Sequence, residues 1–253
     1  CNRSDRRNAT ASTVSRYARP TPAASSTMAT EVVDSLLVAE LFYSIQGEST
    51  WAGLPCLFVR LSGCNLRCSY CDARYTWEEP GQAMAVGAII DWLRQRPEVM
   101  VEITGGEPLQ QPAVYALMQE LLAEGRRVLV ETNGSLPLCA VPDGVHIIMD
   151  VKCPGSGMAQ YHLSENFSVL AERARRGCRD EVKFVLSSEA DFHFARDLVS
   201  LHHLDPLLPV LFSPVRNRLM PTRLAELLLQ HQLKARLQLQ LHSLLWPGEL
   251  RGV

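Results

Sequence analysis

The amino-acid sequence predicts an α/β fold with a parallel sheet and outer helices, either open or curled into a barrel. From Ser35 onward, short aliphatic runs alternate with amphipathic stretches of helical periodicity, and repeated β-α units of this kind form parallel sheets covered by helices. The chemically unusual residues come directly after the aliphatic runs. They therefore fall at the carboxyl ends of the predicted strands, where α/β folds build their sites.

The predicted strands are brief, rich in aliphatic residues and bounded by Gly, Pro or polar residues. They cover Leu36–Phe42, Cys56–Leu61, Val99–Ile103, Arg127–Glu131, Val145–Asp150, Glu181–Leu186, Leu208–Phe212 and Arg236–Leu241. Helical periodicity is found in residues 85–95, 111–125, 166–177, 189–201 and 222–232. In the second of these helices, apolar residues recur with helical spacing from Val114 to Leu122, and Gly125 is the expected stop.

Length and composition predict one domain. The 253 residues are 47% hydrophobic and 21% charged, which suits a single globular unit with a sizeable core. Residues 1–27 are rich in Ser, Thr, Ala and Arg and have no apolar periodicity, so we expect a disordered leader there. They superficially resemble a transit peptide, but a true start at Met28 is the preferred interpretation. Residues 28–253 are expected to form the single domain.

Charge and cysteine content narrow the class of protein. A formal net charge of −2 gives no reason to expect nucleic acid or a membrane as a partner, and no apolar run is long enough to span a bilayer. Three of the eight cysteines crowd one short loop, and no signal peptide is visible. A metal site in a reduced cytoplasmic compartment is therefore preferred over a disulfide framework.

The crowded cysteines have the spacing Cys64-x3-Cys68-x2-Cys71. A structural zinc site is normally closed by four ligands, and Cys56 lies in a predicted strand, where a buried thiol is favoured. A redox pair of Cys68 and Cys71 would leave Cys64 surplus. A [4Fe-4S] cluster with one iron free of protein ligands accounts for three cysteines, and the open iron can bind a small molecule. We strongly prefer the cluster over zinc.

This cysteine spacing, with Tyr70 before the last cysteine, resembles the signature of the radical S-adenosylmethionine (SAM) superfamily. The resemblance implies a partial, abridged (β/α)6-type radical SAM barrel. It also implies that the open iron binds SAM and that an electron from the cluster cleaves it to methionine and a 5′-deoxyadenosyl radical. One strand later, "TGGEP" (residues 104–108) resembles the superfamily's GGE motif, which contacts the SAM amino group. A glycine pair lets a backbone approach a ligand closely.

A narrower resemblance rests on "FYSIQGEST", "FVRLSGCN", "CSYCD", "TGGEP", "ETNGS" and "DVKCPGSG". Together they resemble the 7-carboxy-7-deazaguanine synthases, from about Leu41 to the C-terminus. That family converts 6-carboxy-5,6,7,8-tetrahydropterin into 7-carboxy-7-deazaguanine with loss of ammonia, and the product feeds deazapurine pathways such as queuosine in transfer RNA. The resemblance further implies a homodimer and a reduced flavodoxin-type electron donor.

The resemblance also assigns residues. The cluster ligands would be Cys64, Cys68 and Cys71, and the SAM contacts would be Tyr70 (through its backbone), Cys71, Asp72, Gly106, Glu107, Asp150, Lys152, Ser213 and Pro214. The substrate contacts would be Ile45, Gln46, Gly47, Arg60, Thr104 and His242. Arg60 resembles the guanidinium that holds the substrate carboxylate, a bidentate task that suits arginine. A lone histidine such as His242 is equally common as a satisfied core residue.

Two positions depart from the family pattern. Relatives commonly have Thr where this chain has Ala73, and that Thr contributes to a Mg²⁺ site, so a Mg²⁺ site is doubtful here. Water or Asp72 could supply oxygen ligands instead, since Mg²⁺ prefers oxygen and keeps waters. Ser243 stands where Lys often follows the late histidine. Four further cysteines have no partner pattern and receive no role: Cys1, Cys139, Cys153 and Cys178.

Two other function classes stay open at this point. A radical SAM activase would generate a glycyl radical on a partner enzyme, consume SAM stoichiometrically and need an open docking surface. The "IQGE" stretch with Arg60 argues against it. A non-enzymatic electron carrier or zinc module would need neither "TGGEP" nor Arg60. The synthase is therefore the preferred prediction.

Overall fold

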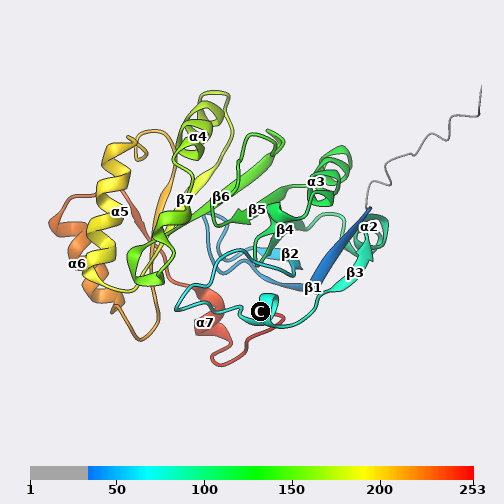
Figure 1. The fold of residues 1–253 in the computed structure, drawn as a ribbon, viewed down its shortest axis with the longest axis horizontal. Helices are drawn as coiled ribbons and strands as arrows, with labels where there is room; N and C mark the ends of the chain where they lie inside the picture. Colours follow the sequence, from blue (N-terminus) through cyan, green and yellow to red (C-terminus); the bar gives the residue numbers. More distant parts are fainter. Residues whose placement is uncertain (1–33) are drawn as a thin grey trace, which may run out of the picture. The chain divides into compact units, whose positions relative to one another are not determined.

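The computed structural model describes residues 34–253, so the prediction for residues 1–27 lies outside the described part. The described residues build one nine-stranded sheet in the order β3-β1-β2-β4-β5-β6-β7-β8-β9 (Figure 1). None of their helices is long and apolar enough to cross a membrane. Because β3 and β9 are the two edges, the sheet is an open, partial barrel, as predicted.

The strands are β1 Ser35–Ile45, β2 Pro55–Leu61, β3 Gln82–Ala85, β4 Met100–Gly105, β5 Val128–Thr132, β6 Val145–Lys152, β7 Glu181–Leu186, β8 Val210–Pro214 and β9 Arg236–Leu237. The helices are α1 Tyr75–Glu78, α2 Val86–Leu93, α3 Ala113–Ala123, α4 Glu165–Arg175, α5 Glu189–Leu201, α6 Pro221–Gln230 and α7 Leu241–Leu245. Short 3-10 turns are η1 Pro108–Gln110, η2 Pro154–Ser156 and η3 Ala159–Tyr161. The five predicted helices correspond to α2–α6.

The sheet is not parallel throughout. From β2 to β9 all neighbouring strands are parallel, but β1 pairs antiparallel with both β2 and β3. A helical crossover enforces parallel pairing, whereas the short loop between β1 and β2 allows an antiparallel pair. The β3 strand escaped prediction because it has four residues, three of them exposed, and therefore lacks a buried apolar pattern.

The last predicted strand is wrong in extent. Arg236–Leu241 was expected to be extended, but β9 ends at Leu237 and helix α7 begins at Leu241. At this edge of the sheet, β9 pairs only with Leu211 and Phe212 of β8. With one neighbour and few ladder bonds, the segment leaves the sheet early. His242 consequently lies in a short helix rather than after a strand.

Alternating side chains divide each inner strand between two faces. On β4, Val101 and Ile103 face the main core, which lies between the sheet and helices α2–α6 on its outer side (Figure 1). The intervening positions face inward. A second, smaller hydrophobic cluster, the inner cluster, packs on this face. It consists of Phe42, Cys56, Phe58, Met100, Leu129 and Ile148, with Trp51 packed against it. Fully burying one such side chain contributes about 1.5–3 kcal/mol.

The loop of residues 46–54, between β1 and β2, reaches across the inner face to distant strands. Its Thr50 backbone N–H donates to the Glu181 carboxylate of β7 at 3.0 Å. Gln238 donates to the Ser49 carbonyl at 2.9 Å, and the Leu241 N–H donates to the Gly47 carbonyl at 3.0 Å. The loop thereby joins the first strand pair to the last elements of the chain.

Candidate active site

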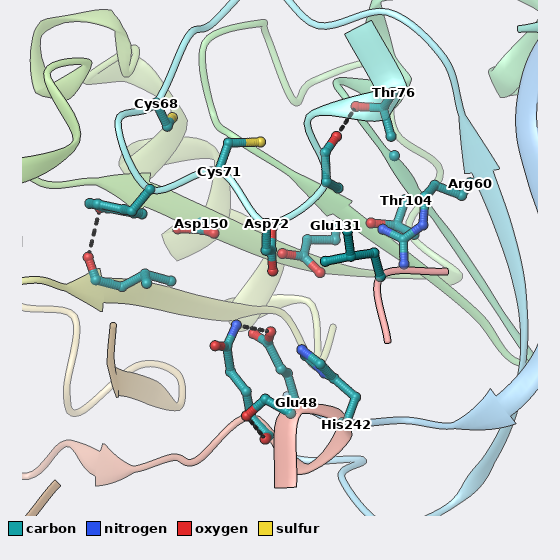
Figure 2. A pocket seen from close by; sticks show the side chains of 18 of the residues that line it. Glu48, Arg60, Cys68, Cys71, Asp72, Thr76, Thr104, Glu131, Asp150 and His242 are labelled. Atoms are coloured by element: carbon teal, nitrogen blue, oxygen red, sulfur yellow. Dashed lines mark hydrogen bonds between the residues drawn. The ribbon is translucent and has the colours of Figure 1, made fainter. Parts of the chain in front are cut away.

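A cavity of about 570 Å³ opens at the carboxyl ends of the parallel strands. Most of the predicted site residues line it: Ile45, Gln46, Gly47, Arg60, Cys64, Cys68, Tyr70, Cys71, Asp72, Ala73, Thr104, Gly106, Asp150, Lys152 and His242. Figure 2 shows Cys68 and Cys71 on one side of the cavity and Arg60 with Thr104 on another. With Glu131 of β5 and Lys183 of β7, which also line the cavity, the structure gathers residues from six strands, the cysteine loop and α7 around one space.

Three predicted residues do not line the cavity: Glu107, Ser213 and Pro214. Glu107 is fully buried, and its carboxylate accepts hydrogen bonds from the Leu109 N–H, the Thr132 hydroxyl and the Asn133 N–H. Its side chain therefore holds η1 against β5. The contact of Glu107 with SAM, implied by the resemblance, stays a prediction.

The glycine pair of "TGGEP" serves contact between two chain segments. A Cβ added to Gly106 would lie 1.9 Å from the Gly63 carbonyl oxygen, and one added to Gly105 would lie 2.1 Å from the Leu61 oxygen. Gly105 also has a φ of 139°, which a residue with a side chain rarely adopts. Bonds from the Gly106 and Glu107 N–H groups to Leu61 and Gly63, at 3.0 and 2.8 Å, tie the turn to the cysteine loop. The glycines thus set the position of that loop.

The three loop cysteines are free thiols, partly exposed to the cavity. Burial raises the pKa of the Cys68 thiol to about 11. Two other cysteines are buried away from the cavity: Cys56 in the inner cluster and Cys153 in the main core. The four-cysteine zinc site considered from the sequence is therefore not assembled. The loop offers three soft donors facing one cavity, and this donor set suits an iron–sulfur cluster with one position open.

Asp150 and Lys152, both on β6, form a polar pair in the cavity wall. Lys152 donates to Asp150 Oδ2 at 2.8 Å, and the neighbouring carboxylate keeps the pKa of Lys152 above its usual range despite burial. The other oxygen, Asp150 Oδ1, is buried and lacks a hydrogen-bond partner within residues 34–253. A buried acceptor without a partner is costly, so this atom is suited to a hydroxyl donor of a bound molecule.

Arg60 on β2 and Thr104 on β4 are register partners in adjacent parallel strands, so their side chains lie side by side (Figure 2).

Two further contacts hold other parts of the cavity wall. A Cβ added to Gly47 would lie 2.5 Å from His242 Nδ1, which shows how closely the loop of residues 46–54 packs on α7. The Tyr70 hydroxyl donates to the Val185 carbonyl at 2.9 Å. This bond holds the Tyr70 side chain against β7.

A group of buried charges in the cavity wall was not predicted, apart from Asp150. Lys183 on β7 has a side chain that is 2% exposed and lies between three carboxylates: Glu48, Glu131 at 2.6 Å and Asp150 at 3.6 Å. Glu102 on β4 accepts a hydrogen bond from Gln46. Strand alternation carried a usable signal, because Glu102 shares a face with Thr104, and Lys183 is the register partner of Asp150.

These charges shift one another's ionisation. Burial alone would raise the pKa of Glu48, but Lys183 and His242 outweigh it and lower that pKa to about 2. Burial disfavours the charged form of Lys183, yet the Glu131 and Glu48 carboxylates raise its pKa well above the usual range. Burial raises the pKa of Glu102, and Glu131 raises it further, to about 8. Burial and Glu131 thus favour the neutral form of Glu102.

Glu102→Gln tests this neutral acid through stability. The pKa of Glu102 is about 8 in the folded protein and 4.5 as the ordinary value. The folded state is therefore most stable, with respect to this group, below pH 4.5, and it loses that stability as the pH rises through 8. We expect the variant to match the parent near pH 5 and to exceed it by about 2–4 kcal/mol in unfolding free energy at pH 9. Urea titrations at both pH values measure this, with the exposed Glu120→Gln as control. A pH-independent difference would contradict it.

Ala73 itself supplies no side-chain ligand for Mg²⁺. Ala73 lines the cavity but has no side-chain oxygen, and its carbonyl accepts a hydrogen bond from the Thr76 hydroxyl at 2.7 Å. Within the described part of the chain, no group of three or more His, Cys, Asp or Glu side chains is already arranged around a metal position. The Asp72 carboxylate beside Ala73 lines the cavity, so Asp72 stays the candidate oxygen ligand for Mg²⁺.

Comparisons with known proteins identify the relatives of this chain. The radical SAM superfamily profile matches residues 58–188. The 7-carboxy-7-deazaguanine synthase of Chlorobaculum tepidum is 42% identical over 218 residues, which cover 86% of this chain and 97% of the relative. The synthase of Koribacter versatilis is 40% identical over 231 residues, covering 85% and 99%. QueE from Escherichia coli shares the fold, with a TM-score of 0.63 at 23% identity, over 81% of this chain and 94% of that one.

The superfamily profile spans β2 to β7 and includes the cysteine loop and most of the cavity wall. Membership in this superfamily implies a [4Fe-4S] cluster and SAM as cofactors of an enzyme. The two curated relatives match almost over their full length, so the resemblance is not confined to the cofactor-binding half. The chain belongs to the 7-carboxy-7-deazaguanine synthase family of radical SAM enzymes.

Proposed function

We propose that this enzyme converts 6-carboxy-5,6,7,8-tetrahydropterin into 7-carboxy-7-deazaguanine with loss of ammonia, in the biosynthesis of 7-deazapurines such as queuosine. The observation that carries the proposal is one cavity of about 570 Å³ that joins the three cysteines, the Asp150–Lys152 pair and the Arg60 guanidinium. Small-molecule sites range over about 300–1,000 Å³. The cavity therefore has room to hold reacting groups next to each other.

In this proposal Cys64, Cys68 and Cys71 hold the cluster and leave its fourth iron to SAM. When bound, these cofactors supply a 5′-deoxyadenosyl radical that removes a hydrogen atom from the substrate. Asp150 accepts a SAM ribose hydroxyl on its unpartnered oxygen, and Lys152 neutralises the SAM carboxylate. Further SAM contacts come from Asp72 and the backbones of Tyr70 and Gly106.

The substrate side of the cavity is polar. Arg60 binds the pterin carboxylate, with Thr104 beside it. Glu48 and Glu131 are held by Lys183 and offer acceptors for the N–H groups of the aminopyrimidinone ring. Further contacts come from Ile45, Gln46, Gly47 and His242. Holding the reacting carbon next to the SAM carbon is the main contribution of these residues, because positioning removes most of the entropic cost of the encounter.

The lining of the cavity supports a small molecule over a protein substrate. Residues from the last part of the chain, among them Trp246, Glu249 and Val253, line the cavity together with the strands. A radical SAM activase would instead need an open mouth to admit the glycyl loop of a partner enzyme. We further propose a cytoplasmic homodimer that takes electrons from a flavodoxin-type donor.

Anaerobic turnover of the reconstituted full chain tests the function. The reaction contains SAM, dithionite and 6-carboxytetrahydropterin, with and without Mg²⁺, and product and 5′-deoxyadenosine are followed by chromatography. We expect 7-carboxy-7-deazaguanine with many turnovers per SAM, because SAM is regenerated. We also expect little dependence on Mg²⁺, because Ala73 supplies no ligand. Deoxyadenosine release without any change in the pterin would contradict the substrate and favour the activase.

A further inference from the structure

Glu40 on β1 makes an unusual set of hydrogen bonds next to the cavity. Its Oε1 accepts from Arg60 Nε at 2.8 Å and from the Tyr75 hydroxyl at 2.7 Å. Its Oε2 accepts from the Gly252 N–H at 3.1 Å. The Glu40 and Arg60 side chains are only 14% and 17% exposed. One carboxylate thus joins a cavity arginine, the helix after the cysteine loop and the end of the chain.

A β-bulge brings Glu40 to this position. The β1–β2 register shifts between Val38 and Glu40. On one side of the shift, Leu36 and Val38 belong to the main core on the outer face. On the other side, Phe42 belongs to the inner cluster although strict alternation would keep it on the outer face. The bulge therefore turns Glu40 inward, and bulges of this kind re-aim side chains next to active sites.

The bond to Nε decides which atoms of Arg60 remain available. A guanidinium is planar and donates from one edge through Nε and from the opposite edge through its two terminal nitrogens. Glu40 accepts from Nε and from neither terminal nitrogen, so it leaves the terminal edge of the guanidinium free. The Phe42 ring lies beneath, with its centroid 5.3 Å from the guanidinium carbon. Two contacts thus fix the plane of a long side chain that would otherwise rotate freely.

We propose that Glu40 is a positioning residue that holds the Arg60 guanidinium so that its terminal nitrogens present a bidentate edge to the substrate carboxylate. This inference rests on the proposed function, because it takes the carboxylate of the pterin as the ligand of Arg60. Glu40 itself touches no substrate. The Tyr75 hydroxyl and the Gly252 N–H in turn hold the Glu40 carboxylate. The helix after the cysteine loop and the end of the chain therefore both help to fix the orientation of the Arg60 guanidinium.

The experiment compares two ligands that differ in one group. Reconstituted full-length enzyme with SAM is titrated with 6-carboxypterin and with pterin, which lacks the carboxylate. For the parent we expect tighter binding of 6-carboxypterin. Glu40→Ala is expected to weaken 6-carboxypterin by about tenfold while leaving pterin unchanged, because a charged hydrogen-bond partner is lost at the carboxylate site alone. Glu40→Asp, whose shorter side chain keeps the charge, is expected to restore part of the difference.

Glu40→Gln guards against a folding defect, because it keeps the size of the side chain and an acceptor oxygen; an intermediate loss is expected. The exposed Glu120→Ala is the matched control and should bind like the parent. Two results would overturn the positioning role, provided that the parent binds 6-carboxypterin more tightly than pterin. One is that Glu40→Ala lowers the affinity for both ligands equally, and the other is that it keeps the full difference between them. A parent that fails to distinguish the two ligands would instead overturn the proposed binding of the carboxylate by Arg60, and with it this inference.

Discussion

Replacement of Cys68 by serine is expected to remove the cluster and all turnover. The three loop thiols are the only cysteines that line the cavity in residues 34–253, and three ligands leave none in reserve. Changes to groups that merely support a ligand cost about 10–100-fold in metal affinity or activity, so losing a ligand is expected to cost at least about a hundredfold. Iron per chain, the visible absorbance of the reconstituted protein and deoxyadenosine formation measure the effect.

Cys139→Ser provides the matched control for this substitution. Cys139 is exposed and does not line the cavity, so its variant should retain iron, absorbance and turnover. If Cys68→Ser kept a full iron content and cleaved SAM at the parental rate, the assignment of the three cysteines would be wrong.

Replacement of Lys183 by methionine is expected to produce the largest loss of stability. Methionine has a similar volume but no charge, so Glu48, Glu131 and Asp150 would remain close together without their shared ammonium group. Removing one partner of a buried ion pair typically costs about 3–5 kcal/mol. We expect a loss of that size in unfolding free energy at pH 7, measured by urea titration. Turnover should also fall, because the Glu48 and Glu131 carboxylates are no longer held in place by Lys183.

Two measurements check the cause. Lys234→Met removes an exposed lysine that has no ion-pair partner in the described part of the chain, and it should change stability by less than about 0.5 kcal/mol. Adding Glu131→Gln to Lys183→Met should recover part of the loss, since one unpaired charge is then removed. A double variant no more stable than Lys183→Met alone would show that packing, and not charge, dominates at this position.

Most of the fold could be predicted because it is encoded locally. Buried strands such as β4 and β7 are short apolar runs with polar ends, and helices α2–α6 have clear apolar periodicity. The failures lie at the two edges of the sheet. Strand β3 is largely exposed, and β9 has two residues and one neighbour. At such edges pairing depends on what lies next to the segment and leaves little trace in its own composition.

The sequence by itself determined the chemistry of the cofactor loop and its place at the carboxyl ends of the strands. The cysteine spacing is a local property and the strand order is a topological one. Both can therefore be predicted without knowing where the side chains lie. Only the tertiary structure decided how the remaining polar residues are used. Lys183 meets Glu48 across 135 positions of sequence, and a register shift turns Glu40 inward to Arg60. Such contacts depend on pairing between distant segments, and a one-residue shift in strand register moves a side chain to the opposite face.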